Sequence, residues 1–238
     1  MTDRYFVQSP IAADRAVLEG PEAHHLIHVM RAKPGAMVTL FDGSGLEFQA
    51  SVESVGRSQV QLAILSRQEV DREAQAKIIL GVALPKGDRQ RWLVEKCTEL
   101  GVAELAPLDT ARGVAEGGEK SLERLRRSVV EASKQCGRTR LMQIAAVRSW
   151  TEFITSAKTG LRLVAHPGGA PAARILQQSL TAISQPVHIA IGPEGGLTDA
   201  EIELAKQHGW QPVDLGRRIL RIETAAVALA ACFALRSD

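Results

Sequence analysis

The sequence predicts an α/β protein in which a mostly parallel sheet, covered by helices on both faces, follows a smaller β-rich domain. From residue 77 onward, short apolar runs alternate with amphipathic segments, which is the pattern of parallel strands joined by helices. Before residue 66, strand-like runs are separated by turns rich in glycine and serine. Residues 66–76 are polar and charged, so we expect them to link domains at residues 1–72 and 73–238.

Composition is typical of an ordinary globular protein, because 45% of the 238 residues are hydrophobic and 24% are charged. The net charge of +2 does not by itself indicate nucleic-acid binding, so any such contact must come from local clusters of basic residues. No apolar run is long enough to span a membrane, and the first residues lack the apolar core of a signal peptide. Cys97, Cys136 and Cys232 are distant and odd in number, which favours a reducing, cytoplasmic location without disulfides.

The first domain is expected to contain a helix and several strands. Residues 38–41, 47–55 and 59–65 are strand-like, and residues 21–31 form a short helix before them. His24 and His28 on that helix are i, i+4 neighbours that could share a metal ion. A packed or surface helix is the favoured interpretation, because catalytic zinc sites usually have a third protein ligand, and we expect no metal.

The second domain is expected to begin with a buried strand at residues 78–84. Asp88 can cap the helix that follows, and Ser121 starts a later, longer helix. The last helix is apolar almost all round, so we expect it to be buried on every side. The other expected strands are residues 102–108, 161–165, 187–191 and 212–215, and the last helix is residues 223–235.

A glycine-rich stretch follows the expected strand at residues 187–191. Three glycines lie within residues 192–196, and Thr198 with Glu201 has the spacing of a capping box at the start of a helix. A strand that ends in glycines leaves bare backbone groups at the edge of a sheet, where open α/β proteins bind ligands. A tight turn without a ligand is the alternative, and neither common nucleotide-binding fingerprint is present.

A second stretch, at residues 215–226, strengthens the ligand-binding interpretation. A glycine follows the expected strand at residues 212–215, and Arg217, Arg218 and Arg221 lie beside an apolar pair in the loop. Three arginines within five residues are unusual for a plain turn. An alanine-rich helix begins directly after them.

Together, residues 192–197 (GPEGGL) and 215–225 (LGRRILRIETA) resemble the bacterial ribosomal RNA small-subunit uridine-N3 methyltransferases of the SPOUT class. The resemblance implies a trefoil-knot α/β domain, a PUA-like β-barrel domain before it, and a homodimer. It also implies S-adenosylmethionine as methyl donor and 16S ribosomal RNA, within the small ribosomal subunit, as substrate. The N-terminal likeness is looser, since Ala36 stands where the family usually has an acidic residue.

The methyl donor is expected at the ends of the strands. Backbone groups at Gly192, Leu215 and Leu220 can read the edge of adenine without side chains, and His166 follows another strand directly. A structural role for His166, and a purely capping role for Thr224, are the alternatives. The residues expected to bind the donor are His166, Pro167, Gly192, Pro193, Glu194, Gly195, Gly196, Leu215, Gly216, Ile219, Leu220 and Thr224.

Methylation at N3 of uridine needs the weakly acidic imide to lose its proton, so positive charge near the base should favour the anion. Arg138, Arg218 and Glu194 are the expected catalytic residues. For Arg138 a structural ion pair is the alternative, and for Arg140 the structural interpretation leads. Glu194 could contact the donor, orient an arginine or cap a helix. The expected RNA-binding residues are Arg4, Arg31, Lys86, Arg138 and Arg221, and for Arg4 and Arg31 a solvated surface position is the alternative.

Two other functions remain compatible with the sequence. One is 2′-O-methylation of ribose by the same fold, and the other is a non-catalytic RNA-binding protein that kept the fold. Residues 111–119 are less basic than the family usually is at that loop, which weakens the case for RNA contacts there.

Overall fold

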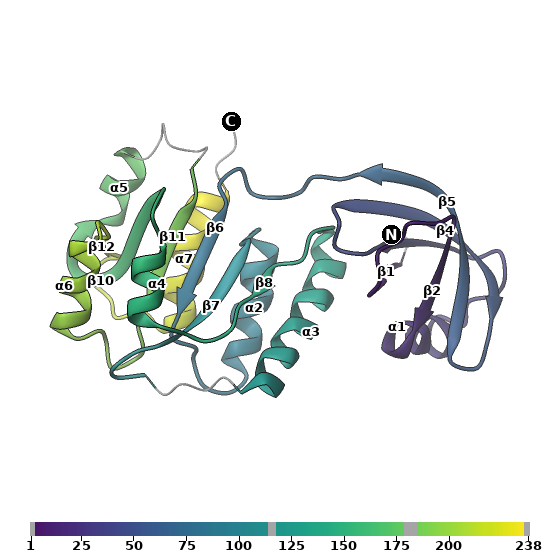
Figure 1. The fold of residues 1–238 in the computed structure, drawn as a ribbon, viewed down its shortest axis with the longest axis horizontal. Coiled ribbons are helices and arrows are strands. Elements are labelled where there is room, and N and C mark those ends of the chain that lie inside the picture. The colour runs from purple at the N-terminus through teal and green to yellow at the C-terminus, as the bar shows by residue number, and fades with distance from the viewer. Residues whose placement is uncertain (1–2, 114–117, 179–184, 236–238) are drawn as a thin grey trace. The chain divides into compact units, whose positions relative to one another are not determined.

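The computed structural model describes residues 3–113, 118–178 and 185–235. The chain forms two compact units, one of Met1–Glu73 with Ser133–Leu141, and one of Ala74–Ala132 with Met142–Asp238 (Figure 1). The segment Ser133–Leu141 of the first unit contains the last turn of a long helix, α3 (Glu119–Cys136). The sequence alone assigned this segment to the second domain. Among the described helices, none is long and apolar enough to cross a membrane.

The first unit is built on a five-stranded sheet of order β1-β3-β4-β5-β2, in which only the β1–β3 pair is parallel. Its core gathers the inward-facing side chains, among them the fully buried Tyr5, Phe48 and Leu62. In β2 buried and exposed residues alternate strictly, because one face of the strand packs on that core. The strands are β1 (Arg4–Phe6), β2 (Arg15–Glu19), β3 (Met37–Phe41), β4 (Leu46–Val55) and β5 (Gln59–Glu69).

Two expectations for the first unit need correction. The helix expected at residues 21–31 is α1 (Gly20–His24) followed by a π-helical turn, η1 (His25–Val29), and Arg31 has a φ of 52° that ends it. The expected linker is partly strand, since β5 continues to Glu69 and pairs there with β4. Those strand residues are polar because they are exposed, so their composition resembled that of a linker.

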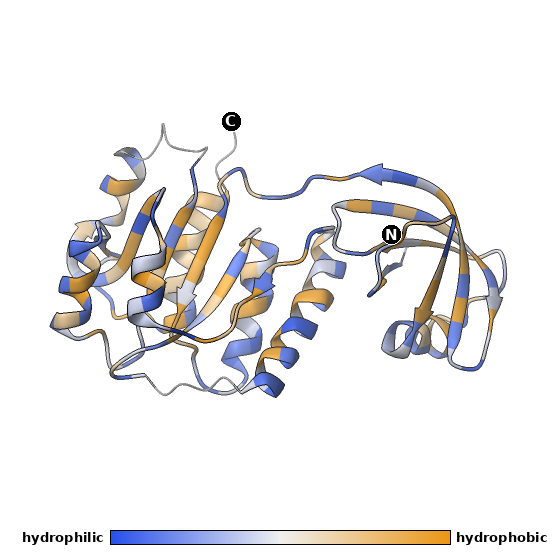
Figure 2. Cartoon of the chain, in the orientation of Figure 1, coloured by the Kyte–Doolittle hydropathy of each residue, from blue (hydrophilic) through white to orange (hydrophobic). Residues whose placement is uncertain are grey.

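The second unit contains a seven-stranded parallel sheet of order β12-β10-β11-β6-β7-β8, with β9 paired to β7. This confirms the predicted mostly parallel α/β sheet. Its central strands carry almost unbroken apolar runs, as strands covered on both faces do (Figure 2). The strands are β6 (Ile78–Val82), β7 (Glu104–Asp109), β8 (Gln143–Ile144), β9 (Arg148–Ser149), β10 (Leu161–Pro171), β11 (Val187–Ile191) and β12 (Gln211–Asp214).

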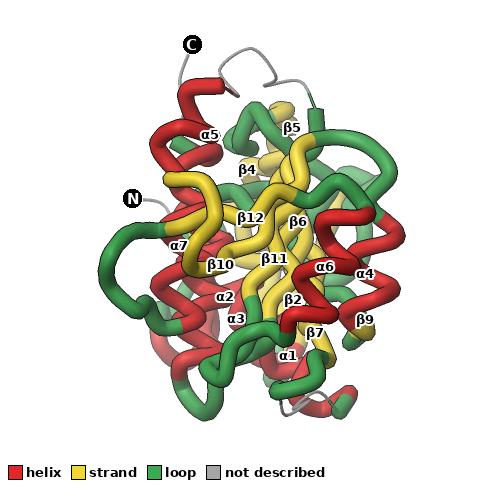
Figure 3. Tube along the Cα trace, turned by 90° about the vertical axis from the view of Figure 1, so that its left-hand side faces the viewer, coloured by secondary structure: helices red, strands yellow, loops and turns green. Residues whose placement is uncertain are grey.

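Helices cover both faces of this sheet (Figure 3). On one face α7 packs against β6, β11 and α2. On the other, α4 and α6 enclose a core that includes Phe153, Ile202 and Trp210. Gly81 lies under this core, since a methyl group there would approach the ring of Phe153 to 2.4 Å. The helices are α2 (Arg89–Glu99), α3 (Glu119–Cys136), α4 (Trp150–Ser156), α5 (Ala172–Gln178), α6 (Asp199–Gln207) and α7 (Ile222–Ala234).

The helix ends test the expected caps. Thr198 and Glu201 form the predicted capping box of α6, and Gly209 follows its end with a φ of 74°. Asp88 occupies the N-cap position of α2, but its side chain makes no capping hydrogen bond, because its backbone is already helical. Helix α7 begins at Ile222 with Arg221 at the N-cap, so the structure does not bear out the alternative in which Thr224 caps this helix.

Helix α7 is less enclosed than its composition suggested. Its face toward the sheet is buried, whereas Thr224 is exposed and Val227 and Ala228 are partly exposed in the single chain. Complete burial was therefore the wrong expectation for one chain, because the helix lies in the outer layer over β6 and β11.

Candidate functional site

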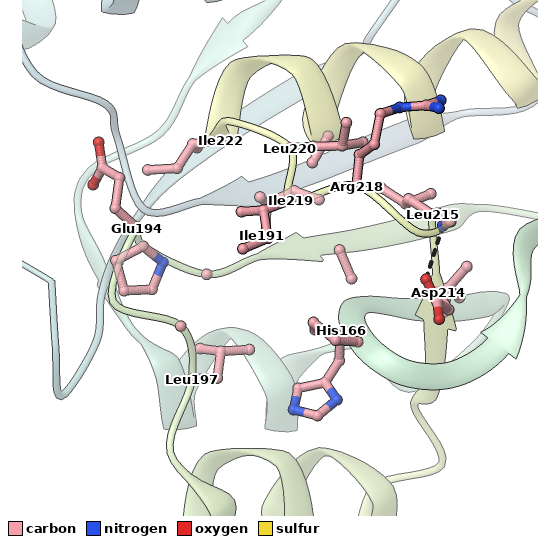
Figure 4. A pocket seen from close by; sticks show the side chains of 18 of the residues that line it. His166, Ile191, Glu194, Leu197, Asp214, Leu215, Arg218, Ile219, Leu220 and Ile222 are labelled. Carbon is pink, nitrogen blue, oxygen red and sulfur yellow. Dashed lines mark hydrogen bonds between the residues drawn. The ribbon is translucent and has the colours of Figure 1, made fainter.

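A cavity of about 410 Å³ lies at the carboxyl ends of β11, β12 and the regular part of β10, which ends at Ala165, beside the start of α7 (Figure 4). Three segments that are distant in the sequence meet there: the end of β10, the glycine-rich turn after β11, and the arginine loop between β12 and α7. This is the edge at which parallel α/β sheets bind ligands. Its size falls within the range of about 300–1,000 Å³ that small-molecule sites have.

The glycine-rich turn brings bare backbone to the cavity wall. The N–H of Gly196 donates to the carbonyl of Pro193 at 2.9 Å, which closes a tight turn. Gly196 has a φ of 71°, a conformation that favours glycine. At Gly192 a methyl group would lie 2.7 Å from Cγ of Leu197, so the buried leucine occupies the space of a side chain. The two glycines are therefore required for different reasons, one for conformation and one for packing.

The arginine loop forms the opposite wall. A carboxylate oxygen of Asp214 accepts from the N–H of Gly216 at 2.8 Å, and Gly216 has a φ of 107° (Figure 4). Arg217 and Arg218 line the cavity beyond this turn, and the Ile219 side chain is fully exposed. The loop thus contributes residues to the cavity wall, while the Arg218 guanidinium is directed away from the centre of the cavity (Figure 4).

His166 and Pro167 line the cavity from β10, although their local structure differs from the prediction. The strand does not end at residue 165 but continues to Pro171, with an irregular register after Ala165. Two consecutive glycines allow this, since a side chain at Gly169 would collide with the backbone at Pro212. The imidazole therefore lies within an irregular strand segment.

Most residues expected to bind a ligand line this one cavity. Gly195 and Thr224 are not among the residues that line it, and Gly195 instead faces Arg112. Sequence reasoning missed Asp214, whose signal was its place at the end of β12, and the apolar walls, which looked like ordinary core. The predicted lining residues are His166, Pro167, Gly192, Pro193, Glu194, Gly196, Leu215, Gly216, Arg218, Ile219 and Leu220; those not predicted are Ala165, Ile191, Leu197, Val213, Asp214, Arg217, Ile222 and Ala225.

The loop after β7 braces the glycine-rich turn from outside the cavity. Arg112 donates to the carbonyl of Gly195 at 3.1 Å, and the N–H of Ala111 donates to the Glu201 carboxylate at 2.9 Å. Burial opposes ionisation of Glu201, but its hydrogen bonds from Ala111 and Thr198, with the charge of Arg112, together lower its pKa below the ordinary value. The capping box of α6 is thus also a tie between two loops at the sheet edge.

Arg138 lies in the first unit, not among the residues that line the cavity of the second. Its side chain is 3% exposed and forms a two-pronged ion pair with Glu73, with Nε 3.0 Å from a carboxylate oxygen. Arg4 donates to the backbone carbonyl of Arg138 at 3.2 Å and pairs with Glu47 at 3.4 Å. Burial, partly offset by Glu47, lowers the pKa of Arg4. These contacts are those of the structural alternative for Arg138, and its catalytic role stays a prediction.

The remaining predicted residues are on the surface. Arg31, Lys86, Arg140 and Arg221 are exposed, and Arg31 combines exposure with its unusual positive φ. Lys96 and Glu99 form an i, i+3 ion pair on α2.

No metal site is evident within the described part of the chain. There, no group of three or more histidine, cysteine, aspartate or glutamate residues is arranged to hold an ion. The rings of His24 and His28 lie 4.6 Å apart at a tilted angle, so the two side chains stack on the helix surface.

The fold and site define an RNA methyltransferase of the SPOUT class with an N-terminal PUA-like domain. The sequence profile described as RNA methyltransferase domain matches residues 72–234, and the profile described as RNA methyltransferase PUA domain matches residues 18–65. The chain belongs to the ribosomal RNA small subunit methyltransferase E family. It is 31% identical to the member from Bacillus subtilis, covering 93% of this chain and 92% of that protein. It is 35% identical to the member from Synechocystis, covering 90% and 71%.

Solved structures give the same result. A methyltransferase from Legionella pneumophila in complex with the bound cofactor SAM has a TM-score of 0.89 and 33% identity, with 99% of this chain and 98% of that chain covered. Ribosomal RNA small subunit methyltransferase E from Neisseria gonorrhoeae, bound to S-adenosyl methionine, has a TM-score of 0.84 and 26% identity, with 97% and 96% covered. The family resemblance stated from the sequence is therefore confirmed.

Proposed function

We propose that this RNA methyltransferase transfers a methyl group from S-adenosylmethionine to N3 of one uridine in 16S ribosomal RNA, in the decoding region of the small subunit. The observation that carries the proposal is the cavity at the ends of β10, β11 and β12, built from two glycine-containing loops. The similar structures from Legionella and Neisseria are described as bound to the same methyl donor, which supports placing it in this cavity.

The cavity suits the chemistry of this donor. Apolar side chains such as Ile191, Leu197 and Leu220 supply flat walls for adenine, and the backbone of the two loops supplies hydrogen-bonding groups beside them. The Asp214 and Glu194 carboxylates give acceptors for hydroxyl or ammonium groups. When bound, S-adenosylmethionine supplies a methyl group already activated by a sulfonium. The residues proposed to hold it are the predicted donor-binding residues that line the cavity.

The protein must then orient the base and favour the imide anion. Arg218 is among the residues that line the cavity, and we propose that its guanidinium turns toward the bound base to stabilise negative charge on a uracil oxygen as N3 loses its proton. Arg221, three residues further along the same loop, is exposed and is proposed to contact RNA phosphate. Attack on the methyl group needs N3 of the base to be held in line with it. The walls of the cavity are proposed to hold the base in that position and to exclude water.

The first unit is proposed to hold structured RNA. It carries exposed Arg31 on a constrained backbone, and within it Arg4 donates to the backbone carbonyl of Arg138. We also propose that the enzyme acts as a cytoplasmic homodimer, with exposed Ile219 and the outer face of α7 near the subunit contact. The trefoil knot implied by the resemblance stays a prediction.

The test is methylation of small ribosomal subunits and of free 16S RNA with isotopically labelled S-adenosylmethionine. Digestion to nucleosides and mass spectrometry should find labelled N3-methyluridine. Label on ribose would favour the 2′-O reaction and end the N3 proposal. If the protein binds the donor but labels neither RNA, the proposal that 16S RNA is its substrate is wrong. If it does not bind the donor, a non-catalytic RNA-binding protein is favoured.

A further inference from the structure

We infer that Arg89 is a positioning residue for the methyl-donor site, because its guanidinium joins the glycine-rich turn, through Glu194, to the first turn of α7, through Glu223. The inference rests on the proposed function and adds to it a residue that does not itself line the cavity. Arg89 is the first residue of α2, directly after the loop that follows the central strand β6. It is separated in sequence from both carboxylates by more than a hundred residues, as the hydrogen bond to Glu194 shows with a separation of 105.

The two ion pairs of Arg89 connect different elements of the second unit. One terminal nitrogen of Arg89, Nη2, lies 3.5 Å from Oε1 of Glu194 in the glycine-rich turn. The other, Nη1, lies 3.8 Å from Oε1 of Glu223 in the first turn of α7. Glu194 lines the cavity directly, as does Ile222, the neighbour of Glu223. One planar group therefore spans from the turn after β11 to the helix after the arginine loop.

Burial makes the contact with Glu223 more important than its distance alone suggests. The Glu223 side chain is 8% exposed, and its Oε2 has no hydrogen-bond partner among the described residues. A buried carboxylate is strongly unfavourable unless a positive group lies beside it. Arg89 provides that positive group, so the buried charge holds the guanidinium near the start of α7 and leaves its other edge directed to the turn.

Glu194, in contrast, has a side chain that only an exposed ion pair holds. The Glu194 side chain is 52% exposed, and Gly195 and Gly196 beside it carry no side chains that could pack and fix it. A pair formed by one exposed carboxylate is weak when both partners are free to move. Here one partner is already anchored at Glu223, so less conformational entropy is lost when Glu194 joins it. Arg89 thus reduces the freedom of the cavity wall before the methyl donor binds.

This arrangement predicts an effect on donor binding that differs from an effect on folding. Arg89→Met should weaken binding of S-adenosylmethionine about tenfold, within the range of couplings between contacting charged residues. It should also lower the thermal midpoint, because Glu223 is left buried without its partner. Adding Glu223→Gln removes that charge and should restore the midpoint but not the donor affinity, since Glu194 still lacks its ionic contact with Arg89. Arg89→Lys, which keeps the charge, should recover part of the affinity.

The experiment is calorimetric titration of S-adenosylmethionine into the full chain and its variants, with thermal unfolding of each. Glu194→Gln is combined with Arg89→Met to measure their coupling: in the Arg89→Met background, Glu194→Gln should weaken binding further by less than twofold, whereas alone it should weaken binding several-fold. Arg91→Met is the matched control on the same helix, because Arg91 forms an exposed pair with Glu95 on the surface. It should leave the dissociation constant unchanged.

The outcomes separate this inference from the proposed function. If the unaltered chain binds the methyl donor but Arg89→Met binds it equally well, or if the two substitutions are additive, Arg89 is not a positioning residue and the donor site stands. Recovery of donor affinity by Glu223→Gln would also overturn the inference, because it would assign the effect to folding alone. If the unaltered chain fails to bind the donor, the proposed function falls and this inference with it.

Discussion

Gly192 has no room for a side chain, and the substitution Gly192→Ala turns that geometry into a test of the donor site. The new methyl group would lie 2.7 Å from Cγ of Leu197, which is about 0.8 Å inside the usual 3.5 Å lower limit for favourable carbon contacts. Leu197 is buried in the core shared by α4 and α6, so it cannot turn to solvent without losing that packing.

The expected cost follows from overpacking. Inserting one methyl group into a packed site costs about 1–3 kcal/mol in the free energy of unfolding, and each kcal/mol lowers the melting temperature by about 2–4 °C in a chain of this size. Because Leu197 also lines the cavity, the displaced side chain should enter the donor site. A tenfold increase in the dissociation constant for S-adenosylmethionine, equivalent to about 1.4 kcal/mol, is the expected result.

The same turn supplies the control. A methyl group at Gly195 would meet Cβ of Arg112 at 3.5 Å, an ordinary contact outside the cavity. Gly195→Ala should therefore bind the donor nearly as the unaltered chain does, while Gly192→Ala binds it poorly in calorimetry. Trimming the neighbour in Gly192→Ala/Leu197→Ala should return part of the lost affinity. Equal donor affinity in Gly192→Ala and Gly195→Ala would refute the reasoning, because it would show that this wall does not border the donor.

Three further predictions concern stability and reactivity. Arg138→Met should cost about 3 kcal/mol in unfolding free energy by leaving Glu73 without its buried partner, as measured by urea denaturation, and an unchanged midpoint would count against a structural pair. Folding lowers the pKa of Glu201, so its carboxylate contributes stability above the unfolded glutamate pKa of about 4.3 and loses that contribution as the pH falls further. The difference in melting temperature between the unaltered chain and Glu201→Gln should therefore disappear in acid. A difference that stays constant with pH would contradict this. Burial raises the pKa of the Cys97 thiol to about 12, so a thiol reagent should modify partly exposed Cys136 first and reach Cys97 only on unfolding; early labelling at Cys97 by mass spectrometry would be inconsistent with the core.

The elements whose patterns are local were predictable from the sequence. Residues 187–191 form β11 as expected, and the Thr198–Glu201 capping box lies where its spacing placed it. These features depend on side-chain alternation, apolar runs and hydrogen bonds within a few residues of the chain. The two ligand-binding loops were found for the same reason, since their glycines and arginines stand close together in the sequence.

Features that depend on distant partners were not predictable. The ion pair of Arg138 joins residues 65 positions apart, and the bridge from Arg89 to Glu194 spans 105, so no local pattern marks either pair. The extension of β10 through His166 was hidden as well, because its glycines and prolines suggest a turn when seen in one dimension. Composition also misled at residues 66–69, where exposure of β5 produced a sequence like that of a linker.

The central claim is that the ends of β10, β11 and β12 hold the methyl donor. The most direct measurement is a crystal structure of the chain soaked with S-adenosylmethionine. The account predicts electron density for the donor between the glycine-rich turn and the arginine loop, in contact with the backbone of Gly192 and Leu220. Density for the donor at another place, with this cavity filled only by solvent, would contradict it.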